Sequence, residues 1–439
     1  MRISVIGCGY LGATHAACMA DLGHEVIGID VDPAKIAKLN AGEVPFYEPG
    51  LDEVLQRALA SGRLRFTTSW DEVAEFADAH FLCVGTPQRP GSYAADMQYV
   101  DSAIAELAPR LTRPCLVIGK STVPAGTAQR LAEYLERHAP VAELARLAWN
   151  PEFLREGFAV EDTVTPDRLV YGVADDESAA VLAEIYEPVT VHGMPVIVTT
   201  RPTAELVKVA ANSFLATKIS FINAMAEICE VAGGDVAVLA DAIGHDTRIG
   251  RRFLNAGVGF GGGCLPKDIR AFQERVGELG VGHAVDFLND IDAINLRRRQ
   301  RVVDLALAAA GGSFAEKTVA VLGAAFKPDS DDVRDSPALD IAASISNAGA
   351  TVRVYDPKAM DNAALRFPKL DYAPSVGDAV AGSDVVLHLT EWREFRDLDP
   401  AALTPLVRNP HIIDGRLCLD PQRWRAAGWT YEALGRPTV

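Results

Sequence analysis

The chain has 439 residues, of which 49% are hydrophobic and 23% charged, so it is long enough for two or three domains with cores of their own. Its formal net charge of −17 argues against a general nucleic-acid or membrane-surface binder, which would carry a basic face. The sequence has no run of roughly 18 apolar residues, so we expect no transmembrane helix. Seven cysteines without a Cys-x-x-Cys pair predict free thiols in a reducing, cytoplasmic compartment.

The first part of the chain alternates between strand and helix patterns. We expect a helix over 10–22 and strands over 2–6, 25–29, 79–84, 115–118 and near 146–149. This alternation predicts a parallel α/β sheet.

A glycine motif joins the first strand to the first helix through Gly7, Gly9 and Gly12. Such glycines permit a tight turn, close approach of a pyrophosphate and helix–strand packing. Asp30 follows 18 residues after Gly12, at the end of the second strand. A carboxylate there can accept ribose hydroxyls and would repel a 2′-phosphate, which predicts NAD rather than NADP. Lys35 is a plausible cationic neighbour, and a surface role for Asp30 is the alternative.

Two further strand-end loops carry polar candidates. The segment from Asn150 to Gly157 contains Glu152 and Glu156, which are candidates for general acid–base work. Thr122 follows another strand and would reach the same edge of the sheet. A solvated loop is the alternative for the two glutamates.

One uninterrupted helical pattern covers 203–232 and spans about 45 Å. It is apolar on most sides, so we expect it to be buried between domains or subunits. Lys208 and Asn212 share one face of it. Both side chains could take part in chemistry. Alternatively, Lys208 is a snorkelling lysine whose ammonium reaches water, and Asn212 forms a hydrogen bond between helices. A second long helix is expected at about 284–310.

The segment Gly257–Asp268 places Cys264 after five glycines. Pro266 suits the first turn of a helix, which we expect to continue over 269–279. A helix N-terminus and the nearby Lys267 both favour the thiolate form of a cysteine. The alternative is a glycine-rich turn that holds a buried cysteine.

The opening pattern returns after 312, with strands expected at 317–322, 351–355 and 384–389 and a helix at 338–347. We therefore predict two Rossmann-like, doubly wound parallel-sheet domains joined by a central helical region with one long helix. The predicted boundaries are 1–200, 201–312 and 313–439. Cations in the last domain's strand-end loops indicate a second anion site, with a surface charge as the alternative for each: Lys327, Arg334, Lys358 and Arg416. No metal-binding or Gly-x-Ser-x-Gly motif is present, and no metal is expected.

Short motifs occur in one order along nearly the whole chain: Gly7–Gly12, Tyr47–Leu51, Val84–Pro87, Ser121–Pro124, Asn150–Leu154, Lys208 with Asn212, Gly261–Asp268, Ala325–Pro328 and Thr390–Trp392. Together they resemble the UDP-glucose/GDP-mannose dehydrogenase family. The resemblance implies oxidation of UDP-glucose to UDP-glucuronate with two NAD and without release of the aldehyde. It implies that Cys264 holds the aldehyde as a thiohemiacetal and then as a thioester, and that Glu156 activates water to hydrolyse the thioester.

Other roles also rest on the resemblance. Lys208 and Asp268 match positions that steer a proton and stabilise an oxyanion, and Asn212 and Thr122 match positions that contact the substrate oxygen or the catalytic water. The implied cofactor residues are Gly7, Gly9, Gly12, Asp30, Lys35, Thr86, Thr122, Lys267 and Arg334. The implied substrate residues are Glu152, Phe153, Leu154, Lys208, Asn212, Arg248, Phe253, Leu254, Asn255, Gly261, Phe326, Lys327 and Arg416.

The resemblance also bears on assembly and specificity. Arg248 matches a position that reaches the substrate of a neighbouring subunit, which implies a homodimer or larger homo-oligomer formed through the long helix. Gly263 and Leu265 depart from many relatives, and GDP-mannose or a UDP-N-acetyl sugar are alternative substrates. A β-hydroxyacid dehydrogenase or a non-catalytic nucleotide sensor are further alternatives. Cys264 and the second α/β domain argue against the first, and intact Cys264, Lys208 and Glu156 argue against the second.

Overall fold

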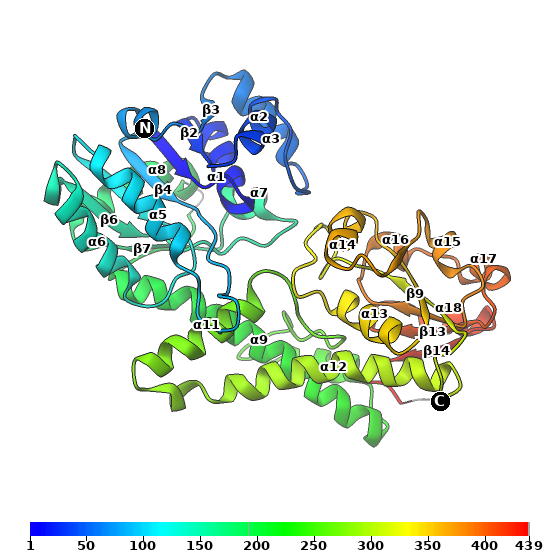
Figure 1. Cartoon of the computed structure of the whole chain (residues 1–439). Helices are drawn as coiled ribbons and strands as arrows, with labels where there is room; N and C mark the ends of the chain where they lie inside the picture. Colours follow the sequence, from blue (N-terminus) through cyan, green and yellow to red (C-terminus); the bar gives the residue numbers. More distant parts are fainter. Residues whose placement is uncertain (192, 438–439) are drawn as a thin grey trace. The chain divides into compact units, whose positions relative to one another are not determined.

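Two α/β units form this computed structural model, which describes residues 1–191 and 193–437. The first unit consists of Met1–Ala211 and Arg270–Gly282, and the second of Asn212–Ile269 and His283–Val439. Each unit contains one sheet, drawn blue to green in the first unit and yellow to red in the second (Figure 1). The expected fold class is confirmed.

The sheet of the first unit has the order β3-β2-β1-β4-β5-β6-β7-β8 within the described residues. Its pairs are parallel except β6–β7, where Trp149 lies opposite Gly172 in antiparallel register. The strands are β1 (Arg2–Ile6), β2 (Glu25–Ile29), β3 (Leu64–Thr67), β4 (Ala79–Leu82), β5 (Cys115–Gly119), β6 (Ala145–Trp149), β7 (Leu169–Gly172) and β8 (Val196–Thr199). The strand order reverses between β1 and β4, and such a switch point opens a crevice at the carboxyl ends of the strands.

Helices cover both faces of this sheet because its strands are apolar on both sides. Ile3 and Val5 pack into one buried cluster with α1, whereas Ile6 packs into the cluster on the opposite face. Burying each such side chain contributes about 1.5–3 kcal/mol. The helices are α1 (Tyr10–Asp21), α2 (Pro33–Asn40), α3 (Leu51–Ala60), α4 (Trp70–Phe76), α5 (Gln98–Leu107), α6 (Thr127–His138), α7 (Ala159–Val164) and α8 (Asp176–Thr190).

Four further helices follow: α9 (Arg201–Ala232), α10 (Val236–Gly244), α11 (Leu265–Glu278) and α12 (Phe287–Ala309). Helix α9 is the long helix that the sequence predicts. In the second unit it packs on α12, where the Ser220 hydroxyl donates to the Ile291 carbonyl at 2.8 Å. Helix α11 begins at Leu265 and has Pro266 in its first turn, as expected from the sequence.

The sheet of the second unit has the order β11-β10-β9-β12-β13-β14, and all of its described pairs are parallel. The strands are β9 (Thr318–Leu322), β10 (Thr351–Tyr355), β11 (Asp371–Tyr372), β12 (Val385–His388), β13 (His411–Asp414) and β14 (Thr430–Ala433). The helices are α13 (Pro337–Asn347), α14 (Met360–Arg366), α15 (Val376–Val380), α16 (Arg393–Arg396), α17 (Pro400–Leu403) and α18 (Pro421–Ala426). This order repeats that of the first six strands of the chain, which confirms the expected structural repeat.

Six observed strands were not expected from the sequence: β3, β7, β8, β11, β13 and β14. Each of these strands has four residues or fewer, too few for a period of two to stand out from the flanking loops. Among the described residues, every helix is too short or too polar to cross a lipid bilayer.

Candidate active site

The loop between β1 and α1 leaves almost no room for side chains. Gly7 has φ of 90°, and a Cβ there would lie 2.8 Å from Val84 Cγ1. A Cβ on Gly12 would overlap the Gly7 carbonyl oxygen, whereas a Cβ on Gly9 would meet nothing within 4 Å. Gly7 and Gly12 therefore allow close packing, and Gly9 faces open space where a pyrophosphate could approach the backbone.

Asp30 ends the second strand beside this loop. Its carboxylate accepts the Cys8 N–H at 2.9 Å, the Asp32 N–H at 3.1 Å and the Lys35 ammonium at 2.9 Å. Burial alone would raise the pKa of Asp30, but these hydrogen bonds outweigh burial and lower it. Since a carboxylate offers about four acceptor positions, three partners leave room for a ribose hydroxyl.

The remaining predicted cofactor residues fall in both units. In the first unit, the Thr86 hydroxyl donates to the Thr122 carbonyl at 2.8 Å, which joins the loops after β4 and β5. Together with the glycine loop and Asp30, these residues fit a dinucleotide at the switch point. Lys267 and Arg334 lie in the second unit, so their part in cofactor binding stays a prediction.

Lys208 and Glu152 form a buried ion pair in the first unit. The ammonium lies 3.0 Å from the Glu152 carboxylate, and the two side chains are 6% and 14% exposed. Glu152 also accepts the Leu154 N–H at 2.6 Å. The Phe153 ring lies 5.6 Å from the Lys208 ammonium and 3.8 Å from the Arg168 guanidinium. The structure thus replaces the snorkelling alternative for Lys208 with a specific buried partner.

The backbone of the loop that follows Thr122 is held by a glutamate side chain that the sequence did not reveal as a site residue. Glu205, one turn before Lys208 on α9, accepts the N–H groups of Gly126 and Ala128 at 2.8 and 2.6 Å. Burial raises the pKa of Glu205, although these hydrogen bonds oppose the change. A glutamate on a helix gives no sequence signal for a partner about 80 residues away, so this support could not be predicted.

Cys264 immediately precedes α11 in the second unit, and its carbonyl accepts the Asp268 N–H at 2.9 Å. One turn along, the buried Asp268 carboxylate accepts the Asn212 amide at 2.7 Å and the Lys267 ammonium at 2.5 Å. Asn212 therefore has a defined partner on α11. All seven cysteines lie within the described residues and none forms a disulfide, and Cys264 alone among them is exposed.

The glycines before Cys264 pack on loops of the C-terminal sheet in the same unit. A Cβ on Gly261 would overlap the Asp335 carbonyl, one on Gly262 would lie 2.8 Å from the Phe326 ring, and one on Gly263 would overlap the Arg334 guanidinium. The Gly262 N–H also donates to the Arg334 carbonyl at 2.8 Å. Close backbone packing therefore accounts for this run of glycines.

The Arg416 side chain binds the backbone of the same loops. Its guanidinium donates to the carbonyls of Leu389, Gly259 and Phe326 at 2.7, 3.2 and 3.0 Å, and pairs with Glu391 at 3.2 Å. The loops after β9, β12 and β13 thereby meet the Cys264 loop around one cation.

The other predicted substrate residues have different surroundings. Arg248 is 88% exposed and pairs with Asp246, and Phe253 is partly exposed with φ of 65°. Leu254 is buried, Asn255 accepts a hydrogen bond from Arg251 at 2.7 Å, and the Lys327 ammonium lies 5.4 Å from the Phe326 ring.

Three domain models of the UDP-glucose/GDP-mannose dehydrogenase family match the chain in order. The NAD-binding domain matches residues 1–190, the central domain 202–297 and the UDP-binding domain 320–421. The chain belongs to this family.

Individual relatives agree over the full length. A UDP-glucose 6-dehydrogenase of Rhizobium meliloti (strain 1021) is 40% identical over 439 residues, with 100% of both chains covered. The structure of a UDP-glucose dehydrogenase from Pyrobaculum islandicum has a TM-score of 0.91 and 38% identity, and covers 99% of this chain and 98% of that one. That of a UDP-D-ManNAc dehydrogenase from Pyrococcus horikoshii has a TM-score of 0.87 and 28% identity, with 100% of both chains covered. The chain is an NAD-dependent nucleotide-sugar dehydrogenase.

The UDP-binding domain of this dehydrogenase uses the counterpart of Asp30 differently. Asp356 follows β10 as Asp30 follows β2, and it accepts the N–H groups of Ala324 and Ala325 at 2.7 and 3.0 Å. It also accepts the Trp392 indole N–H at 3.0 Å and two further backbone N–H groups. Five donors leave this carboxylate no acceptor position for a ribose.

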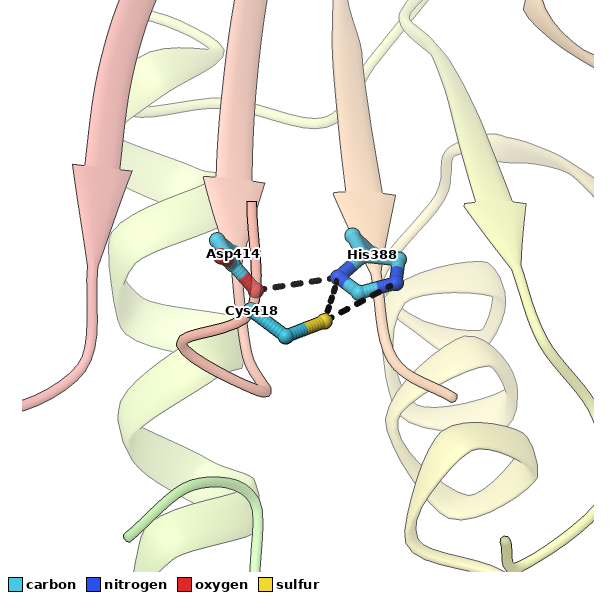
Figure 2. A group of neighbouring side chains, drawn as sticks. All are labelled: His388, Asp414 and Cys418. Carbon is cyan, nitrogen blue, oxygen red and sulfur yellow. Dashed lines mark hydrogen bonds and ion pairs between the residues drawn. The ribbon is translucent and has the colours of Figure 1, made fainter. Parts of the chain in front are cut away.

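His388, Asp414 and Cys418 lie together at the ends of β12 and β13 (Figure 2), with His388 and Asp414 buried and Cys418 half-buried. His388 Nδ1 lies 2.9 Å from Asp414, and Cys418 Sγ lies about 4 Å from both ring nitrogens. Burial alone would lower the pKa of His388, but Asp414, helped by Cys418, raises it to about 9. The sequence did not reveal this group, because His388 and Asp414 come from different strands.

The spacing of the three side chains could suit a metal ion, but the hydrogen bonds argue for another role. Asp414 accepts from His388, from the N–H groups of Arg416 and Leu419 at 3.0 and 2.9 Å, and from the Tyr431 hydroxyl at 2.9 Å. These four donors occupy a carboxylate's usual acceptor positions. We therefore interpret the group as an ion pair that holds the backbone of the Arg416 loop.

Two glycine variants separate packing from cofactor binding. Gly12→Ala should lower the free energy of unfolding by about 1–3 kcal/mol, because its Cβ overlaps the Gly7 carbonyl. Gly9→Ala should keep the melting temperature and raise the KM for NAD by about tenfold or more, since its Cβ enters the open space. Thermal unfolding and initial rates measure both. An unchanged KM for NAD in Gly9→Ala would show that the Gly9 backbone does not approach the cofactor.

The His388–Asp414 pair should make stability depend on pH. Since the folded pKa of His388 is about 9, above the ordinary value of 6.5, its contribution is complete below pH 6.5 and is lost as pH rises through 9. Urea unfolding should show the difference between wild type and His388→Asn shrinking over that range. Asp414→Asn should remove the same dependence, and a difference that grows with pH would contradict the interpretation.

Proposed function

We propose that this dehydrogenase oxidises UDP-glucose to UDP-glucuronate in two steps without releasing the aldehyde. The observation that carries the proposal is the exposed Cys264 thiol at the start of α11, one turn before the buried Asp268–Asn212 pair. Full-length similarity to proteins named UDP-glucose 6-dehydrogenase supports this choice of sugar over GDP-mannose or a UDP-N-acetyl sugar.

The chemistry assigned to Cys264 allows four electrons to pass from the C6 hydroxymethyl group of the sugar to two NAD⁺. NAD⁺ held at the glycine loop and Asp30 would supply the acceptor for one hydride in each of the two oxidations. The Cys264 thiolate adds to the C6 aldehyde to form a thiohemiacetal, and the second oxidation leaves a thioester. Glu156 removes a proton from water, which attacks the thioester carbonyl and releases the carboxylate and the thiolate. One alcohol, two NAD⁺ and one water thus give one carboxylate, two NADH and three protons.

Further residues are proposed to supply charge and orientation. Lys208, held against Glu152 in an almost buried pair, is proposed to stabilise the developing oxyanion and steer its proton. Asp268 shares that role, and its contacts with Asn212 and Lys267 support a fixed orientation. Asn212 and Thr122 are proposed to contact the substrate oxygen or the catalytic water.

Cofactor and substrate are assigned to different domains. We propose that 1–200 binds NAD, with Asp30 on the ribose hydroxyls, that 201–312 mediates dimerisation and carries the Cys264 loop, and that 313–439 binds the sugar nucleotide. Phe326, Lys327 and Arg416 are proposed to contact the substrate from this last domain. The free thiols are consistent with a cytoplasmic location.

We also propose that α9 forms a homodimer interface. Phe214, Phe221 and Ile228 follow one another at intervals of seven residues and are 66%, 47% and 54% exposed. Side chains at this spacing form one stripe along a helix. A second copy of the same stripe would bury them, and Arg248 is proposed to reach the partner's substrate.

Two variants test the covalent chemistry. Cys264→Ser should lower turnover of UDP-glucose by at least about a hundredfold, because a serine hydroxyl is a far weaker nucleophile at neutral pH. Glu156→Gln should stall after the second oxidation, and intact-mass measurement after mixing with UDP-glucose and NAD should show one covalent adduct. Full turnover by Cys264→Ser with two NADH per sugar would rule out the thiol. Faster turnover of GDP-mannose would change the substrate assignment.

A charge introduced into the stripe of Phe214, Phe221 and Ile228 on α9 tests the proposed dimer interface. Phe221→Asp should shift the protein from dimer to monomer in analytical ultracentrifugation, since an aspartate resists burial in an apolar interface. Leu365→Asp is the control, because Leu365 is 84% exposed on α14 and lies outside the stripe. A Phe221→Asp protein that stays dimeric would place the interface elsewhere.

A further inference from the structure

Glu48 is a buried carboxylate with three donors and no role in the chemistry described above. It lies in the loop before α3 and is 4% exposed. It accepts the N–H groups of Gly157 and Ala159, both at 2.7 Å, and the Tyr10 hydroxyl. The Gly157 N–H also lies 3.1 Å from the Tyr10 oxygen. Both carboxylate oxygens are therefore used.

These donors come from two functional loops of the first unit. Tyr10 is the first residue of α1 and directly follows Gly9 of the glycine loop. Gly157 directly follows Glu156, and Ala159 begins α7. Helices α1 and α7 pack side by side (Figure 1), through a cluster that includes Ala13 and Val160. One carboxylate thus ties the cofactor loop to the backbone beside Glu156.

Glu48 makes more contacts than are needed to cap helix α7. A helix cap commonly uses one side-chain oxygen from a residue next to the helix, whereas Glu48 precedes Ala159 by 111 residues and also holds Tyr10. Gly157 has φ of 82°, a left-handed turn that directs the chain just after Glu156. Burial and Glu48 raise the pKa of Tyr10, which keeps its hydroxyl a donor.

We propose that Glu48 is a positioning residue for the hydrolysis of the thioester. By fixing Gly157 against Tyr10, it holds the Glu156 backbone in a set place relative to the glycine loop, and so directs the carboxylate that activates water. The inference rests on the function proposed for Glu156. It makes the last chemical step depend on a residue that touches neither substrate nor cofactor.

The test uses Glu48→Gln and Tyr10→Phe in the full-length enzyme, with Glu156→Gln as reference. Glu48→Gln keeps the shape but replaces one acceptor oxygen by an NH₂ group, so at least one of the three donors loses its partner. We expect kcat to fall about 10- to 100-fold with KM for NAD changed less than about threefold. After rapid mixing with UDP-glucose and NAD, two NADH per site should form in a burst, and intact mass should show the covalent adduct. Tyr10→Phe should give the same adduct at a lower level.

Asp175→Ala is the control for loss of stability alone. Asp175 caps α8 by accepting the Ser178 N–H at 2.7 Å, and its loss costs about 1 kcal/mol. This control should show no adduct. If Glu156→Gln accumulates adduct while Glu48→Gln and Tyr10→Phe do not, the positioning role is wrong and the proposed function stands. If Glu156→Gln itself gives no adduct, the function proposed for Glu156 is wrong. Should Glu48→Gln fail to fold, Tyr10→Phe decides alone.

Discussion

Buried carboxylates that accept backbone N–H groups are the interaction on which the loops of this protein depend. Asp30 holds the glycine loop, Glu205 the Thr122 loop and Glu48 the Glu156 loop, while Asp356 and Asp414 hold strand-end loops of the second unit. A buried N–H without an acceptor would cost about 1–3 kcal/mol. Because a charged acceptor binds more strongly than a neutral one, a few carboxylates fix loops that have no regular structure.

The second sheet repeats the order of the first six strands of the chain, but the two sheets differ at the equivalent carboxylate. Asp30 has three donors, one of them the side chain of Lys35, and so retains an acceptor position. Asp356 has five donors, including the Trp392 indole, which saturates it. The same fold can therefore present a ribose acceptor at one switch point and a closed structural anchor at the other. This difference agrees with the match of the first part of the chain to an NAD-binding domain and of the last part to a UDP-binding domain.

The Cys264 loop depends on the second sheet for its shape. Its glycines lie directly against Phe326, Arg334 and Asp335, and Arg416 binds carbonyls of the same loops. The conformation that precedes the thiol is thus set by residues 60 to 150 positions further along the chain. A change in those loops would alter the position of the backbone before Cys264 without touching the sulfur itself.

The sequence by itself determined the class of fold, the long helix, the glycine loop with Asp30 and the place of Cys264 before a helix. These features depend on local periodicity and on spacing along the chain, which a sequence displays directly. It did not reveal the shortest strands, the Glu152 partner of Lys208, or the roles of Glu48, Glu205 and Asp414. Their partners lie tens to more than a hundred residues away, and only the packing of the sheets and helices brings them within hydrogen-bond distance. A buried glutamate and a solvated one look alike in sequence, because burial is a property of the folded chain.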